Sequence, residues 1–169
     1  MNALTKGFKP AAFRKSKLAD RGKVAEDKVR EYLEGWASRD TRRDFDRLVD
    51  TKAAGRVIRA AAADFEFFCT NGIEVAAGLI EVKETEHPYR LDRKRLTQAA
   101  RLRKRAKCGC TVLVVVYHST LKKWRTLSQA QVLDTTVGGS WDLRDRPMFD
   151  TPGEALAHAD GVWMWEALS

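Results

Sequence analysis

The chain has 169 residues and a mass of 19.1 kDa, which suits one compact domain, because two domains of this total length would each bury only a marginal core. Its 31 Lys and Arg residues exceed its 23 Asp and Glu residues, and the resulting formal net charge of +8 is compatible with a polyanionic partner. The three cysteines form no CxxC pair and no apolar run approaches the length of a membrane span, which argues against a disulfide scaffold, a structural zinc site and a transmembrane helix. The start shows no apolar core typical of a signal peptide, so we expect a soluble, cytoplasmic protein that does not enter a membrane.

The first part of the chain divides into a basic segment and an amphipathic helix. Residues 1–17 contain no acidic residue and show neither helical nor strand periodicity, so we expect a mobile basic arm in front of a single domain over residues 18–169. Asp20 is a suitable N-cap for a helix that runs to about Trp36. Apolar residues recur there at steps of three and four and predict a buried stripe, which consists of Val24, Ala25, Val29, Tyr32, Leu33 and Trp36.

Strand signals follow this helix. The weaker ones lie between residues 44 and 63. Phe45, Leu48 and Val49 are compatible with an edge strand, and Val57 and Ile58 with a further strand, with Gly55 at the turn between them. The stronger ones are the aromatic segment Asp64–Cys69 (DFEFFC) and the alternating segment Gly78–Lys83 (GLIEVK). Asn71-Gly72 between them is a typical turn pair, so the two segments are predicted to be adjacent strands.

The second half predicts a helix, two strands and a final short helix. Apolar residues at helical spacing indicate a helix from Asp92 to about Lys107, with Gly109 near its end. The unbroken apolar run Thr111–Tyr117 (TVLVVVY) is typical of a strand covered on both faces, and residues 122–127 give another strand. The segment Thr151-Pro152-Gly153-Glu154 has the signature of a capping box. These elements predict an α/β domain with a central mixed β-sheet flanked by helices.

Acidic and basic residues on the two strong strands suggest a site for phosphodiester chemistry. Side chains alternate across a strand, so Glu81 and Lys83 project from the same face, while Asp64 begins the neighbouring strand. Glu26 on the first helix is available as a third carboxylate. Carboxylates are the ligands that Mg²⁺ prefers, and a fixed lysine can orient the attacking water or offset charge in the transition state.

This arrangement resembles the PD-(D/E)xK nuclease superfamily, whose pattern is an acid on a helix, an Asp at the start of a strand and E-x-K on the next strand. The matching residues are Glu26 within GKVAEDKV, then Asp64, and then Glu81 and Lys83 within IEVKET. The resemblance implies a restriction-endonuclease-like fold and a metal-dependent nuclease. Asp64, Glu81 and Glu26 would bind Mg²⁺, for which Mn²⁺ can substitute, and no other cofactor is implied.

Within that superfamily the segment from about residue 20 to residue 117 is most similar to the RecU-type Holliday junction resolvases and, less closely, to structure-specific phage endonucleases. Gln98 matches a polar helix residue that lies near the metal site in the resolvases. The resemblance implies a homodimer that cuts branched or four-way DNA in a bacterial or phage-infected cell, because two active sites are needed to cut such DNA symmetrically.

A basic segment lies between the E-x-K strand and the apolar strand. Residues 90–107 contain a single acid, Asp92, and one-sided charge of this kind repels itself unless an external anion binds. We therefore expect contacts to DNA phosphates from Arg90, Arg93, Lys94, Arg95, Arg101, Arg103, Lys104 and Arg105.

Other interpretations remain open at the level of sequence. Glu81 and Lys83 are also compatible with an exposed ion pair on an edge strand, and the basic segment with the solvated face of a helix. Asp27, Glu31 or Glu34 can be mistaken for the helix acid in place of Glu26. The alternatives to a resolvase are a restriction-type or end-processing nuclease of the same fold and a catalytically inactive DNA-binding protein.

Overall fold

The computed structural model describes residues 11–48, 61–73 and 75–159, with side chains from residue 22 onward. In chain order its elements are α1 (Ala11–Ala37), β1 (Arg43–Arg47), β2 (Phe65–Thr70), β3 (Val75–Thr85), β4 (Arg90–Asp92), the 3-10 helix η2 (Arg93–Arg95), α2 (Ala99–Lys107), β5 (Thr111–His118), β6 (Lys123–Thr126), α3 (Gln129–Leu133), β7 (Ser140–Asp142) and α4 (Pro152–Ala157). Within these residues no helix has the length and apolar character needed to cross a membrane.

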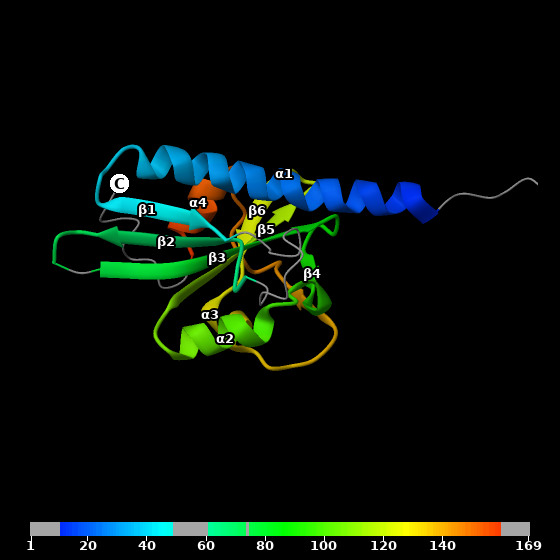
Figure 1. The fold of residues 1–169 in the computed structure, drawn as a ribbon. Helices are drawn as coiled ribbons and strands as arrows, with labels where there is room; N and C mark the ends of the chain where they lie inside the picture. The colour runs from blue at the N-terminus through cyan, green and yellow to red at the C-terminus, as the bar shows by residue number, and fades with distance from the viewer. Residues whose placement is uncertain (1–10, 49–60, 74, 160–169) are drawn as a thin grey trace, which may run out of the picture.

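A mixed sheet of five strands in the order β1-β2-β3-β5-β6 forms the centre of the protein. β3 runs antiparallel to β2 and parallel to β5, and the outer pairs β1–β2 and β5–β6 are antiparallel. The parallel connection from β3 to β5 passes through β4, η2 and α2. Helices lie above and below this sheet in Figure 1, so the predicted class of an α/β domain with a flanked mixed sheet is confirmed.

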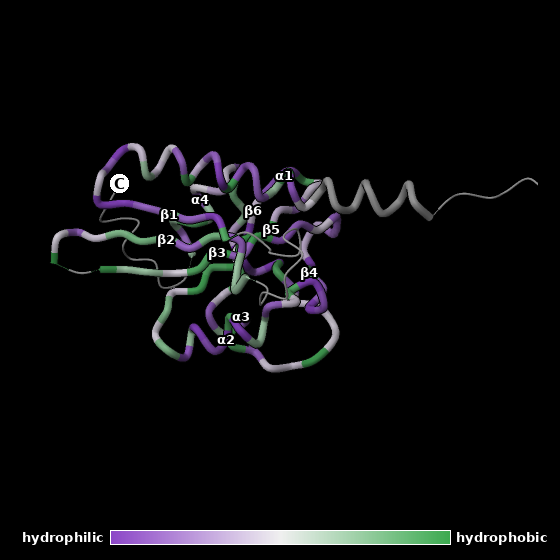
Figure 2. The backbone as a smooth tube through the Cα atoms, viewed as in Figure 1, coloured by the Kyte–Doolittle hydropathy of each residue, from purple (hydrophilic) through white to green (hydrophobic). Residues whose placement is uncertain are grey.

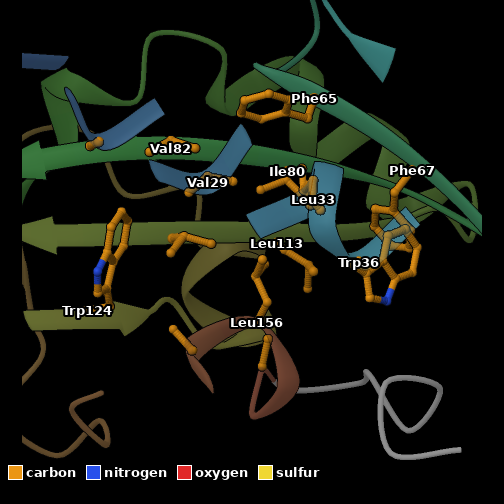
Figure 3. Packing of buried hydrophobic residues seen from close by; sticks show 14 of the residues in the cluster. Val29, Leu33, Trp36, Phe65, Phe67, Ile80, Val82, Leu113, Trp124 and Leu156 are labelled. Carbon is orange, nitrogen blue, oxygen red and sulfur yellow. The ribbon is translucent and has the colours of Figure 1, made fainter. Parts of the chain in front are cut away.

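Two apolar layers cover the faces of the sheet. On one face α1 and α4 pack against β2, β3 and β5, where Val29, Leu33, Phe65, Ile80 and Leu156 are fully buried (Figure 3). On the other face α2 and α3 contribute to the second layer, which includes Leu79, Leu91, Leu102, Val114, Val116, Trp141 and Leu143. Because the apolar side chains of β3 and β5 alternate between the layers, adjacent residues of these strands face opposite helices.

The central strands have the composition that this double cover requires. Every residue of β5 from Val112 to His118 is buried, as the unbroken apolar run predicted. Figure 2 shows hydrophobic residues along the central strands and hydrophilic residues along much of α1 and α2. The edge strand β1 pairs with β2 alone, which confirms the prediction made for Phe45.

Two predicted helix starts are wrong. α1 begins at Ala11 and not at Asp20, so residues 11–17 of the predicted mobile arm are helical, whereas residues 1–10 lie outside the described residues. The Ala, Arg and Lys residues of that segment favour helix without any apolar stripe, which periodicity alone overlooks. α2 begins at Ala99 and not at Asp92, because residues 90–92 pair with β7 and the Asp92 carboxylate caps η2 by accepting from Lys94 N.

Several elements were absent from the sequence-based prediction, and one prediction cannot be compared. The strands β4 and β7 form a two-stranded sheet of three residues each, too short to leave a periodic signal. α3 begins with a complete capping box between Ser128 and Gln131, a pattern that the sequence does contain. The strand predicted at Val57 and Ile58, with its turn at Gly55, lies outside the described residues.

We predict opposite effects of alanine at two glycines. A Cβ at Gly78 on β3 would lie 2.4 Å from the Phe67 ring and 2.7 Å from the Thr111 carbonyl oxygen, so Gly78→Ala should lower the free energy of unfolding by about 1–3 kcal/mol. Gly35 in α1 has open space around it, so Gly35→Ala should raise this free energy by up to about 1 kcal/mol through helix propensity. Urea unfolding measures both values. A Gly35→Ala protein less stable than wild type would contradict the open space that surrounds Gly35 in α1.

Candidate active site

Asp64 links three strands at the point where β2 begins. Its backbone N–H donates to Ile80 O at 3.2 Å, and its carbonyl oxygen accepts from Leu48 N at 2.9 Å. β2 begins at Phe65, opposite Ile80, so the N–H of Val82 lies beyond the β2 ladder. The Asp64 carboxylate takes the place of a strand there, because Oδ2 accepts from Val82 N at 2.7 Å. Asp64 is thereby held beside the part of β3 that carries the E-x-K sequence.

Glu81 and Lys83 lie on the β3 face that packs toward α2, as their alternation with Ile80 and Val82 requires. Glu81 is fully buried, at 0% exposure, and Lys83 Nζ forms an ion pair with its Oε1 atom. Lys83 is the one cationic partner of this carboxylate among the described residues, and the Oε2 atom has no hydrogen-bond partner there. A buried acid left in this state is costly unless a cation satisfies it. The structure therefore excludes the interpretation of Glu81 and Lys83 as an exposed pair on an edge strand.

Glu26 reaches the same region from α1. It follows Ala25, which is buried against the sheet, and its Oε2 atom accepts from Arg47 Nη2 at 3.2 Å. The negative charge of Asp64 acts on Glu26, and that of Glu26 acts on Glu81. Of the acids on this part of α1, Glu26 is therefore the one whose charge the structure couples to the β3 residues.

A cavity of about 380 Å³ connects these elements. Its lining comes from α1, the end of β1, the segment before β2 and the turn before α2, and consists of Glu26, Arg47, Leu48, Ala61, Ala63, Asp64 and Gln98. The sheet is narrower here, because β1 and β2 do not continue alongside the second half of β3. Residues from both helical layers consequently meet at one opening.

The carboxyl groups in this region have raised pKa values. Burial raises the pKa of Glu81 to about 7, an effect that Asp64 and Glu26 increase and Lys83 opposes. Burial also raises the pKa of Asp64, against the lowering effect of Lys83 and of the bond from Val82 N. For Glu26, burial and then the charge of Asp64 raise the pKa, against the effect of Arg47. Burial is thus the main cause of all three shifts, and neighbouring carboxylates add to it for Glu81 and Glu26.

The donor set fits a hard divalent cation. Mg²⁺ is commonly held by one or two carboxylates together with water and phosphate oxygens, and Asp64 and Glu81 supply two carboxylates side by side. Among the described residues, no three His, Cys, Asp or Glu side chains are grouped closely enough to bind one ion together. Glu26 lines the same cavity as Asp64, where it is available to a metal-bound water molecule or a second cation.

Gln98 lines the cavity, but as the N-cap residue of α2 and not within the helix as predicted. Its side chain does not cap the helix; its Oε1 atom accepts from the Thr97 hydroxyl at 2.7 Å. The amide group of Gln98 therefore remains at the cavity.

The eight basic residues predicted to bind DNA divide into three groups. Arg93 pairs with Asp134 and stacks on Trp141 at 4.7 Å, and Arg103 donates to Asp134 O at 3.0 Å. Both therefore hold the segment after α3 in place. Three others use part of their side chains within the protein: Arg95 donates to Glu84 O, Arg101 donates to Ala61 O at 3.4 Å and Arg90 stacks on Tyr89. The remaining three of the eight, Lys94, Lys104 and Arg105, are exposed.

Arg47 is a cavity residue that the sequence analysis overlooked. It ends β1, a strand predicted only weakly, and no sequence motif marks it. Its only signal was position, since it lies one residue before the apolar Leu48 in the predicted edge strand.

Comparison of the sequence with models of protein families gives no matching family, and a search of curated proteins gives no significant match.

The raised pKa of Glu81 predicts how stability changes with pH in the absence of metal. Between the ordinary carboxyl pKa of 4.5 and about 7, the folded protein retains a proton that the unfolded chain has lost. This contribution to stability is present below pH 4.5 and is lost as the pH rises through about 7. Thermal unfolding in EDTA should therefore show a fall over this range that is smaller in Glu81→Gln. Identical pH profiles for the two proteins would contradict the burial of an ionisable Glu81.

The division of the basic residues predicts two kinds of variant. Arg93→Gln and Arg103→Gln should lower the melting temperature by several degrees, because each removes a contact to Asp134. Replacing Lys94, Lys104 and Arg105 with Gln should leave the melting temperature nearly unchanged, because these side chains are exposed. Calorimetry distinguishes the groups, and equal melting temperatures throughout would show that Arg93 and Arg103 are not structural.

Proposed function

We propose that the protein is a metal-dependent DNA endonuclease that hydrolyses phosphodiester bonds in branched DNA. The observation that carries the proposal is that Asp64 lies beside the β3 segment of Glu81 and Lys83, where the buried Glu81 carboxylate pairs with Lys83 and its Oε2 atom has no hydrogen-bond partner among the described residues. The E-x-K order on β3 and the preceding Asp support the resemblance to PD-(D/E)xK nucleases.

Each residue has a role that follows from its position. Asp64 and Glu81 would hold Mg²⁺ or Mn²⁺, and the ion would activate water and offset the charge that develops on the phosphate. Lys83 is placed to orient the attacking water, since its ammonium already lies at Glu81 and is fixed before the reaction. Gln98 and Glu26 line the cavity together with Asp64 and can hold water in place there.

The resolvase resemblance supplies the finer part of the proposal. A homodimer would present two such sites to a branched substrate, and a four-way junction is the substrate that the resemblance favours. Exposed cations of η2 and α2 would bind the DNA backbone without reading sequence, which suits selection by structure.

We predict that Asp64→Asn, Glu81→Gln and Lys83→Ala each lower the cleavage rate by at least about a hundredfold, because a fixed charge at the transition state is typically worth roughly 3 kcal/mol. Asp44→Asn is a matched control, since Asp44 is an exposed acid on β1 that does not line the cavity. The measurement is single-turnover cleavage with excess enzyme. Near-normal cleavage by Lys83→Ala would overturn the assigned site.

The metal and the substrate are tested together. Linear duplex, flapped and four-way DNA are incubated with Mg²⁺, Mn²⁺, Ca²⁺ or EDTA, and cleavage of the four-way DNA should require Mg²⁺ or Mn²⁺, since Ca²⁺ favours longer and looser coordination. Cleavage in EDTA would exclude the mechanism. Cleavage of linear duplex at an equal rate by a monomer would favour a restriction-type or end-processing nuclease. Binding without cleavage under every condition would indicate an inactive DNA-binding protein.

We further predict that the Lys94, Lys104 and Arg105 triple Gln variant has a weaker salt dependence of DNA binding. The slope of log affinity against log salt should fall by up to about one unit for each lost phosphate contact. Preference among the DNAs should change little, because these contacts are not with bases. Fluorescence anisotropy in EDTA gives the slope, and an unchanged slope would mark these residues as a solvated face.

A further inference from the structure

Arg47 is a cation placed at the cavity of the candidate active site. Its backbone is fixed in the β1–β2 ladder opposite Phe65, and the next residue, Leu48, donates to the carbonyl oxygen of Asp64 at 2.9 Å. Arg47 lines the same cavity as Asp64 and Gln98, and its charge acts on Asp64 and on Glu26. The β1–β2 pairing thus fixes the backbone of Arg47, while its guanidinium remains at the cavity.

The guanidinium is held loosely. It makes one hydrogen bond within the described residues, from Nη2 to Glu26 Oε2 at 3.2 Å, although a guanidinium carries five N–H donors. The side chains of Arg47 and Glu26 are 42% and 29% exposed, and partly exposed ion pairs of this kind contribute little to stability. An anion that enters the cavity and accepts two hydrogen bonds from the guanidinium can therefore replace Glu26.

Other arginines in this region are committed differently. Arg101 donates to the carbonyl oxygen of Ala61, while Arg93 and Arg103 hold the segment at Asp134. Lys83 is engaged with the buried Glu81. Of these cations, Arg47 is the one whose side chain lines the cavity.

We propose that Arg47 binds a phosphodiester group of DNA at the active site, and that its ion pair with Glu26 is exchanged for that phosphate when the substrate binds. The inference rests on the proposed nuclease function and adds a substrate-binding residue to it. Arg is suited to this role because its planar fork donates two parallel hydrogen bonds to a phosphate. Among the residues that line this cavity, Arg47 is the cation that faces a phosphate beside Glu26 and Asp64.

Glu26 then has two successive partners. Before substrate binds it neutralises Arg47, and afterwards its carboxylate is free to hold a water molecule. The exchange also limits unwanted binding, because any anion that binds Arg47 must compete with Glu26.

A double-mutant cycle in EDTA tests this exchange without any cleavage. The affinity of a fluorescent four-way DNA and of a linear duplex is measured for wild type, Glu26→Gln, Arg47→Gln and the double variant. Glu26→Gln should tighten binding about threefold to tenfold because it releases Arg47, and Arg47→Gln should weaken binding about tenfold. In the Arg47→Gln background, the gain from Glu26→Gln should fall by at least half.

Controls separate the inference from folding and from the proposed function. Asp40 and Arg42 form an exposed ion pair outside this cavity, so the cycle of Asp40→Asn and Arg42→Gln should show little coupling in DNA binding. Arg47→Lys, which keeps the charge but not the fork, should bind with intermediate affinity, and its melting temperature should match that of wild type.

Equal gains from Glu26→Gln in both backgrounds, or wild-type affinity of Arg47→Gln, would overturn the role of Arg47. If wild type nevertheless cuts DNA with Mg²⁺, the nuclease proposal stands while the inference fails. Absence of DNA binding by wild type would overturn both.

Discussion

The hydrogen bond from Val82 N to Asp64 Oδ2 is the interaction on which the candidate site depends. β3 has 11 residues and β2 has 6, so β3 extends beyond its antiparallel neighbour. The second half of β3 would expose unpaired N–H groups there, and a carboxylate satisfies one of them at the bend before β2. Because the same residue bonds through its backbone to Leu48 and Ile80, Asp64 fixes three strands relative to one another. The requirement to satisfy a strand edge thus places an acid next to Glu81 and Lys83.

This placement has an electrostatic consequence. Glu81 is buried on a strand whose other face packs into the larger apolar layer, and the nearby carboxylates oppose its ionisation. Lys83 compensates in part through the ion pair, and a divalent cation would complete the compensation. An apolar pair at positions 81 and 83 would suit a core equally well, so a retained buried ion pair fits a functional role better than a purely stabilising one.

The fold and the site were predictable to different degrees. The strands β2, β3 and β5 followed from Asn71-Gly72, from the alternation in GLIEVK and from the run TVLVVVY, because these signals are local. The positions of Asp64, Glu81 and Lys83 followed from strand alternation and pairing. The starts of α1 and α2 did not, because helix propensity without an apolar stripe extends α1, and because the tertiary pairing of β4 with β7 takes residues 90–92 away from α2. Arg47 and the structural roles of Arg93 and Arg103 depend on contacts far along the chain, which composition cannot reveal.

The most direct test of the central claim, that Asp64 and Glu81 form a divalent-cation site beside Lys83, is anomalous diffraction from crystals of the protein soaked in Mn²⁺. We expect an anomalous peak within about 2.5 Å of carboxylate oxygens of both Asp64 and Glu81, as coordination of a hard cation requires. We also expect the peak to be absent from crystals of Glu81→Gln. The account would be contradicted if no anomalous peak appeared at these two carboxylates in saturating Mn²⁺ while the wild-type protein cleaved DNA under the same conditions.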